Sequence, residues 1–180
     1  MQRQEIEQYL AELGQTLEQQ GVQQPVRILL IGGAYMLTQF HNRANTNDID
    51  ILLEDVDNPT APLYQAFRTA ARIVAQKHKL SMSWINDVIG DFVRDVSIIP
   101  QGTLWRRFAA LEVYIPPSEY ILALKLLAGR QKDSPDIGVL CQQLHIQTRS
   151  QAQQLVDRYI PDRQVQQMND LDDTLDDIFS

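Results

Sequence analysis

The sequence Val26-Arg-Ile-Leu-Leu-Ile-Gly-Gly33, followed after a short interval by Asn47-Asp-Ile-Asp-Ile-Leu-Leu53, sets the architecture of this 180-residue chain. Each segment contains a short apolar run of the kind found in buried strands, and a helix is predicted between them over residues 34–40. The two glycines at the first junction allow positive φ and a close approach of the backbone to a ligand. The N–H groups at the start of the following helix point to the same place, which favours phosphate. We therefore expect an anion site at Gly32 and Gly33.

The second segment adds two acidic side chains to this site. Asp48 and Asp50 are two positions apart in a predicted strand, so they lie on the same face of it. Neighbouring carboxylates repel each other and favour a bound cation, and Mg²⁺ prefers oxygen ligands of this kind. Alone, a Gly-Gly pair is usually a turn and an Asp-x-Asp pair is usually a solvated strand end. In this order they predict a site for phosphoryl or nucleotidyl transfer.

The rest of the sequence predicts a mixed sheet first and helices afterwards. A helix is expected over 3–20, from the spacing of Ile6, Leu10, Leu13 and Leu17, and another over 63–79. Further strands are expected over 80–85, 92–99 and 111–115, and helices from Ser118 onward, interrupted near 134–135, 147–150 and 161. The predicted fold class is α/β (α+β), with a core over residues 1–115 that includes the N-terminal helix. Residues 116–180 are expected to form a C-terminal helical segment packed on that core.

Composition limits the class of protein. The apolar fraction of 44% and charged fraction of 22% are ordinary for a globular domain. No apolar stretch is long enough to span a bilayer, there is no apolar leader, and Cys141 is the single cysteine. These features predict a cytoplasmic protein. The net charge of −7 argues against a broad nucleic-acid surface, although five aspartates in the last eleven residues contribute much of it.

The motif set resembles the nucleotidyltransferase superfamily, which includes DNA polymerase beta and the aminoglycoside-modifying adenylyltransferases. Within that superfamily it is most similar to the AbiEii-like proteins of bacterial toxin–antitoxin systems, which have a Gly-Gly turn and then Arg-x-x-Thr-x-Asp-x-Asp. Here the corresponding residues are Arg43, Thr46, Asp48 and Asp50. A later helix of the form Lys-x-x-Ala-x-x-x-Arg is matched by Lys125 to Arg130, with the arginine earlier than in that form, and a following Asp-x-x-Asp is matched by 133–136.

This resemblance implies a nucleotidyltransferase fold and a Mg²⁺-dependent enzyme that moves an NMP from an NTP to an unknown acceptor, such as RNA, protein or a small molecule. Gly32 and Gly33 would hold the triphosphate, Asp48 and Asp50 would bind Mg²⁺ as catalytic metal ligands, and Arg43, Lys125 and Arg130 would contact phosphate. Thr46 would orient the loop. From helix period alone, a solvated helix face is the favoured interpretation of Lys125, Arg130 and Lys132.

Active members of the superfamily supply a third carboxylate. The candidates are Asp87 first, then Asp95 and Glu112. If none of them reaches Asp48 and Asp50, the chain would instead be a catalytically silent nucleotide-binding or partner-binding module of a two-component system. In the tail, Leu171, Leu175, Ile178 and Phe179 share one face of a predicted helix, which would pack on the body of the protein or on a protein partner. Trp84, Trp105 and Phe108 are expected in the core rather than in a base-stacking platform.

Overall fold

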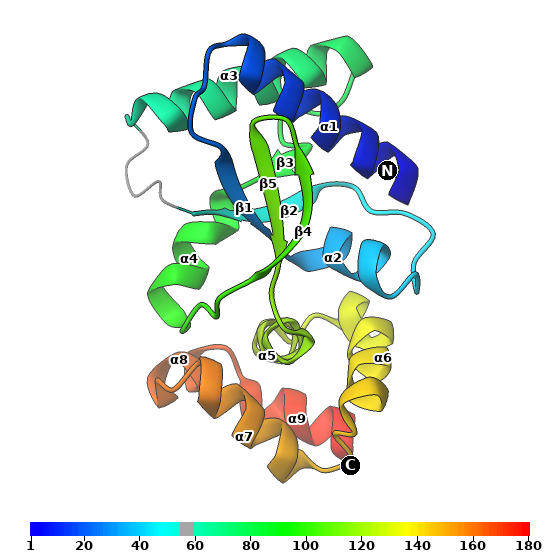
Figure 1. Ribbon diagram of the computed structural model, residues 1–180. Coiled ribbons are helices and arrows are strands. Elements are labelled where there is room, and N and C mark those ends of the chain that lie inside the picture. The colour runs from blue at the N-terminus through cyan, green and yellow to red at the C-terminus, as the bar shows by residue number, and fades with distance from the viewer. Residues whose placement is uncertain (55–59) are drawn as a thin grey trace. The chain divides into compact units, whose positions relative to one another are not determined.

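A computed structural model describes residues 1–54 and 60–180, apart from the side chain of Asp91 (Figure 1). The chain forms two units. The sheet unit comprises Met1–Gly90 and Gly102–Ile115, and the helical unit comprises Asp91–Gln101 and Pro116–Ser180. The predicted boundary between 115 and 116 is therefore one of the places where the chain passes between units, and residues 91–101 join the helical unit as well. The expected packing of the C-terminal segment on the core stays a prediction.

The sheet unit is built on a mixed five-stranded sheet in the order β3-β2-β1-β5-β4. Strand β1 pairs antiparallel with β2 and parallel with β5, while β2 pairs parallel with β3 and β4 pairs antiparallel with β5. The strands are β1 (Val26–Leu30), β2 (Ile49–Leu53), β3 (Ile85–Asn86), β4 (Thr103–Phe108) and β5 (Leu111–Ile115). The mixed sheet with flanking helices that the sequence predicted is present.

The two central strands explain why the sequence pattern was so clear. In β1 only Arg27 is exposed, and in β2 only Asp50 is less than fully buried. Strands that are buried on both faces show continuous apolar runs instead of alternation. The expected strands over 26–31, 49–53 and 111–115 are confirmed as β1, β2 and β5.

The helices of the sheet unit are α1 (Arg3–Gln19), α2 (Gly32–Gln39) and α3 (Pro62–His78), and α4 (Val88–Val96) begins in it. Helix α1 approaches the β4–β5 hairpin through Gly14. A Cβ atom added to Gly14 would lie 1.8 Å from the carbonyl oxygen of Phe108. The amide of Ala110 also donates to the Gly14 carbonyl at 3.4 Å. A glycine inside a helix, unfavourable by propensity, is thus required here by a helix-to-backbone contact.

Three parts of the sequence-based assignment are wrong. Residues 92–99 were expected to form a strand, but they continue helix α4 to Val96, because apolar residues at 89, 92, 93 and 96 also fit helical spacing. The expected strand over 80–85 is mostly turn, and only Ile85 of it pairs in β3. Strand β4 was not foreseen, because a register irregularity between Leu104 and Arg106 interrupts its alternation.

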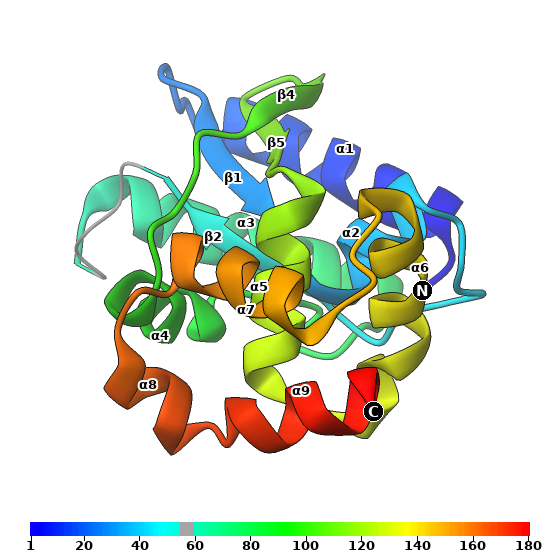
Figure 2. The same ribbon diagram turned by 90° about the horizontal axis from the view of Figure 1, so that it is seen from below.

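In the helical unit, α5 (Ser118–Ala128) is the central helix. It contacts α6 (Ser134–Leu144), α7 (Arg149–Tyr159) and α9 (Leu171–Phe179) (Figure 2). The 3-10 turn η1 (Gln131–Asp133) precedes α6, and α8 (Arg163–Met168) precedes α9. Leu171 and Leu175 of α9 are buried, and Arg149 forms ion pairs with Asp172 and Asp176 at 2.5 Å each. Part of the apolar face of α9 is therefore covered within its own unit. No helix in the described part of the chain is long and apolar enough to cross a membrane.

Candidate functional site

The glycine turn after β1 touches the carboxylate strand directly. Gly32 has φ +65°, and a Cβ atom on it would lie 2.3 Å from Oδ2 of Asp50. The amide of Ile31 donates to the carbonyl of Asp50 at 3.0 Å, which holds the two segments together. An L side chain at position 32 would be strained by its backbone angle and would displace the Asp50 carboxylate. The sequence therefore needs glycine here for the close approach of turn and acid.

The second glycine brings the loop before β2 to the start of α2. A Cβ atom on Gly33 would lie 2.8 Å from Oγ1 of Thr46 and 3.2 Å from Nη1 of Arg43. Thr46 is buried, and its hydroxyl donates to the carbonyl of Asp48 at 3.1 Å. A guanidinium group is thus placed beside the helix start, where the first backbone N–H groups have no partner within the helix. Gly33, Arg43 and Thr46, predicted from sequence to share a site, lie together.

Asp48 and Asp50 are both half-buried, with Asp48 immediately before β2 and Asp50 in it. Asp50 is paired in register with Asn86 of β3, and Nδ2 of Asn86 donates to its Oδ1 at 3.2 Å. Oδ1 of Asn86 in turn accepts from the amide of Val88 at 3.1 Å. Asn86 therefore orients one of the two acids. The sequence pattern did not point to Asn86, because its contact with Asp50 depends on the register between β2 and β3.

This donor set fits Mg²⁺. The ion takes oxygen ligands from one or two carboxylates and completes its shell with water and substrate phosphate. Two half-buried acids two positions apart would meet that requirement, although Asp48 lies just before β2 and not in the strand where the sequence placed it. Within residues 1–54 and 60–180, no group of three or more His, Cys, Asp or Glu side chains suited to a metal is present.

The three candidates for a third carboxylate have different surroundings. Asp87, although next to Asn86, forms an ion pair with Arg68 of α3 at 3.0 Å. Asp95 lies on α4 in the helical unit. Glu112 is paired in register with Arg27, near the end of β1 opposite the glycine turn.

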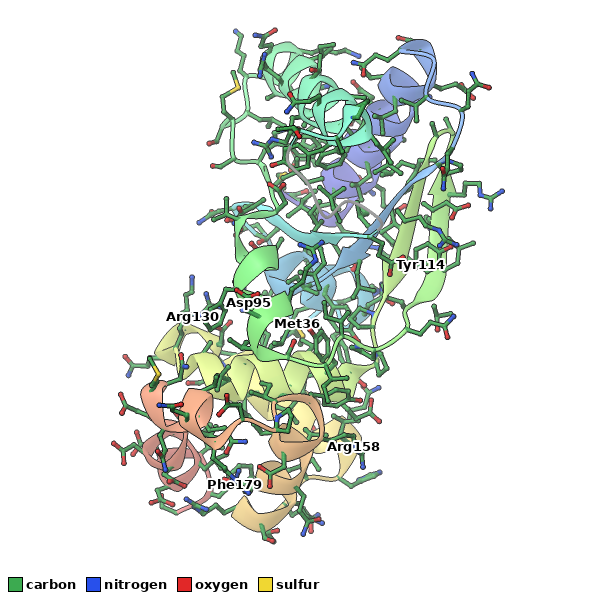
Figure 3. The ribbon with its side chains drawn as sticks, turned by 90° about the vertical axis from the view of Figure 1, so that its left-hand side faces the viewer. Met36, Asp95, Tyr114, Arg130, Arg158 and Phe179 are labelled. Carbon is green, nitrogen blue, oxygen red and sulfur yellow. The ribbon has the colours of Figure 1, made fainter. Side chains whose placement is uncertain are left out.

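Glu112 belongs to a cluster of its own on β1, β4 and β5. Its carboxylate accepts from the hydroxyl of Tyr114 at 2.9 Å (Tyr114 is labelled in Figure 3) and pairs with Arg27 and Arg107 at 3.4 and 2.5 Å. Burial alone would raise the pKa of Glu112, but the hydrogen bonds from Tyr114 and Arg27 and the charge of Arg107 outweigh burial and lower it. Glu112 is therefore held as a charged partner of two arginines.

Lys125 lies in a closed ionic cluster in the helical unit. Its ammonium group contacts Asp133 at 2.7 Å and Asp136 at 2.8 Å, and the three side chains are 4%, 3% and 0% exposed. Arg130, labelled in Figure 3, donates to Asp133 at 2.8 Å. Burial would raise the pKa of Asp133, but the hydrogen bond and charge of Lys125, with Arg130, lower it. Asp133 is therefore a structural partner of Lys125 and Arg130, and a phosphate role for Lys125 and Arg130 stays a prediction.

No family model, no curated protein and no solved structure matches this chain. A proposal about its function therefore rests on the residues of the site themselves.

Proposed function

We propose that this chain binds the triphosphate of a nucleotide together with Mg²⁺ at Gly32, Gly33, Asp48 and Asp50, and that it is a nucleotidyltransferase of the superfamily it resembles. The observation that supports this most directly is the approach of Asp50 to the turn. The missing Cβ of Gly32 leaves Oδ2 of Asp50 beside the backbone at the start of α2. Anion-binding N–H groups and a cation-binding carboxylate in contact are what a metal–phosphate ligand requires.

Each residue of this site would have its own role in binding phosphate or Mg²⁺. The N–H groups at the start of α2 would bind phosphate oxygens, and Arg43 would add a planar, charged donor beside them. Asp48 and Asp50 would hold Mg²⁺, which when bound supplies charge neutralisation of the phosphates and polarises the transferred group. Asn86 would keep Asp50 in its orientation through the 3.2 Å hydrogen bond. The acceptor of the nucleotidyl group is RNA, protein or a small molecule.

A second candidate function is a catalytically silent nucleotide-binding module of a two-component, toxin–antitoxin-like system. It is favoured by one specific observation. The β3 residue paired with Asp50 is an amide, Asn86, and the neighbouring acid Asp87 is engaged by Arg68. A site arranged in this way would bind a nucleotide without a third carboxylate to accept the proton of an acceptor hydroxyl.

The test is to measure binding and transfer separately. Calorimetry with each of four NTPs, with and without Mg²⁺, would be combined with α-³²P transfer assays on RNA and protein from cell extract. The Asp48→Asn, Asp50→Asn double variant removes two charges with little change in shape. Asp177→Asn, an exposed change on α9, is the matched control.

Mg²⁺-dependent binding and label transfer by the wild type and by Asp177→Asn, both lost in the double variant, would support the enzyme. Binding without transfer would favour the silent module. The absence of Mg²⁺-dependent binding to any NTP would refute both functions.

A further inference from the structure

The loop between α2 and β2 carries much of the proposed site but has no regular structure of its own. Residues 41–48 include Arg43, Thr46 and Asp48, and none of them belongs to a helix or strand. Such a segment keeps its side chains in place only if its backbone groups are satisfied by other parts of the molecule. The contacts that hold this loop therefore determine how well the site is preformed.

Met1 makes two of these contacts. The amide of Thr46 donates to the carbonyl of Met1 at 2.9 Å, and the amino group of Met1 donates to the carbonyl of Thr46. Both backbone polar groups of Thr46 are thus satisfied by one residue. Since the Thr46 hydroxyl also contacts the backbone of Asp48 and lies against Gly33, Met1 holds the centre of the proposed site.

Arg3 makes a third contact, at the start of the loop. Its Nη1 lies 2.7 Å from Nε2 of His41, and Nδ1 of His41 lies 3.1 Å from the carbonyl of Leu37. Because the carbonyl can only accept, Nδ1 is the donor and Nε2 accepts from Arg3. His41, at φ 55°, is where the chain leaves α2. Arg3 therefore fixes the loop where it begins.

Residues Met1–Arg3, which we name the N-terminal clip, are themselves firmly held. The amide of Gln2 donates to Oε2 of Glu5 at 2.7 Å, and the amide of Ile6 donates to the carbonyl of Gln2 at 3.1 Å. Ile6 and Leu10, in the first turns of α1, are fully buried. The clip is thus an extension of a helix anchored in the core.

We infer that the N-terminal clip positions the loop of residues 41–48 for nucleotide binding, so that Arg3 and His41 are positioning residues that touch no ligand. The effect on nucleotide binding rests on the proposed function. The positioning of the loop rests on the contacts of Met1 and Arg3 alone. It assigns to the start of the chain a role that the motif set does not include.

The test combines amide hydrogen exchange of residues 41–48 with Mg²⁺–NTP affinity in the full chain. Arg3→Ala and His41→Ala are expected to speed exchange of the Thr46 amide and to weaken nucleotide affinity, each by about tenfold, the effect of losing one hydrogen bond to a charged group. Arg3→Lys keeps a donor for His41 and is expected to restore both. Glu7→Gln removes the ion pairs of Glu7 with Arg3 at 3.2 Å and with Arg106 at 3.4 Å but leaves His41 in place, and exposed Arg72→Ala is a charge control; neither should change exchange in the loop.

Unchanged exchange of residues 41–48 in both Arg3→Ala and His41→Ala would overturn the inference, whatever the nucleotide assay shows. Faster exchange with unchanged affinity, in a wild type that binds nucleotide, would overturn it too. If the wild type binds no nucleotide, the proposed function fails, and the exchange data alone still decide whether the clip holds the loop.

Discussion

Each unit of the protein carries a pair of closely spaced aspartates, and the two pairs have different surroundings. Asp133 and Asp136 enclose Lys125 and are at most 3% exposed. Asp48 and Asp50 are half-buried, and Asp50 lies against Gly32 and accepts from the neutral amide of Asn86. A buried acid pair around a lysine is a completed structural element, whereas Asp48 and Asp50 are the pair that we propose to take a ligand. Spacing in the sequence does not distinguish the two, but their surroundings do.

The largest effect is expected from breaking the closed pair. Lys125→Met would leave two carboxylates buried without their shared cation, and should lower the free energy of unfolding by about 3–5 kcal/mol. Urea denaturation followed by circular dichroism would measure the loss. Lys132→Met, an exposed change seven positions later, is the control and should change stability by about 0.5 kcal/mol or less. Equal stability of Lys125→Met and the wild type would mean that the cluster is not closed as described.

The next largest effect is expected at Gly32, which lies against Asp50. Gly32→Ala combines a positive φ with a Cβ atom against Oδ2 of Asp50, and should destabilise the protein by roughly 2 kcal/mol as well as abolish Mg²⁺–NTP binding. Gly138→Ala is the matched control, because a Cβ atom there meets nothing within 4 Å. That control lies inside helix α6 and should be neutral or stabilising by about 0.5–1 kcal/mol. Thermal melts and calorimetry on both variants would check the expectation, which fails if Gly32→Ala binds nucleotide normally.

A smaller effect is expected when a third acid is added beside Asp48 and Asp50. Asn86→Asp replaces the donor to Asp50 with a carboxylate, and should cost about 1 kcal/mol of stability in metal-free buffer through repulsion and a lost hydrogen bond. Mg²⁺ should restore that stability, so the melting temperature of Asn86→Asp should depend on Mg²⁺ more steeply than that of the wild type. Asn169→Asp makes the same chemical change in the helical unit and should show no such dependence. A melting temperature of Asn86→Asp that is insensitive to Mg²⁺ would argue against a metal at Asp50.

A further effect is expected from Glu12, a half-buried acid of the sheet unit. Glu12 of α1 contacts Lys77 and His78 of α3 at 2.8 Å each, and the hydrogen bond from Lys77 is the main cause that lowers its pKa from 4.5 to about 2. A lowered pKa stabilises the folded state above the unfolded value, and this contribution is lost as the pH falls from about 4.5 toward 2. Urea midpoints measured between these pH values should fall less in Glu12→Gln than in the wild type. Parallel curves for the two proteins would contradict the pairing.

The sequence predicted the central part of the fold well because buried strands and amphipathic helices leave local patterns. Val26–Leu30 and Ile49–Leu53 are continuous apolar runs, and α1 shows its buried face as a regular spacing. The assignment of a strand to residues 92–99 was wrong because their apolar positions fit either period, and β4 was missed because its register irregularity disturbs the alternation. These failures occur where tertiary pairing rather than local pattern decides the conformation.

Some residues of the candidate site could likewise be predicted from the sequence, and others could not. Gly32, Gly33, Asp48 and Asp50 could be predicted because chain order alone places a turn beside the next strand. Asn86 could not, since its hydrogen bond to Asp50 depends on the register between β2 and β3, which are joined by a long helical connection. The burial of Lys125 could not be predicted either, because helical period shows which residues share a face but not whether that face is covered.

Gly14 has a consequence beyond the packing of α1. Since its Cα lies against the Phe108 carbonyl, the distance between α1 and the hairpin is set by the thickness of a peptide backbone, without an adjustable side chain between them. A side chain at position 14 would lift the helix, and the lift would travel along a rigid rod to Met1 and Arg3, whose hydrogen bonds to Thr46 and His41 tolerate little displacement. The packing distance between α1 and the β4–β5 hairpin would in this way also affect the position of the loop of residues 41–48, through Met1 and Arg3.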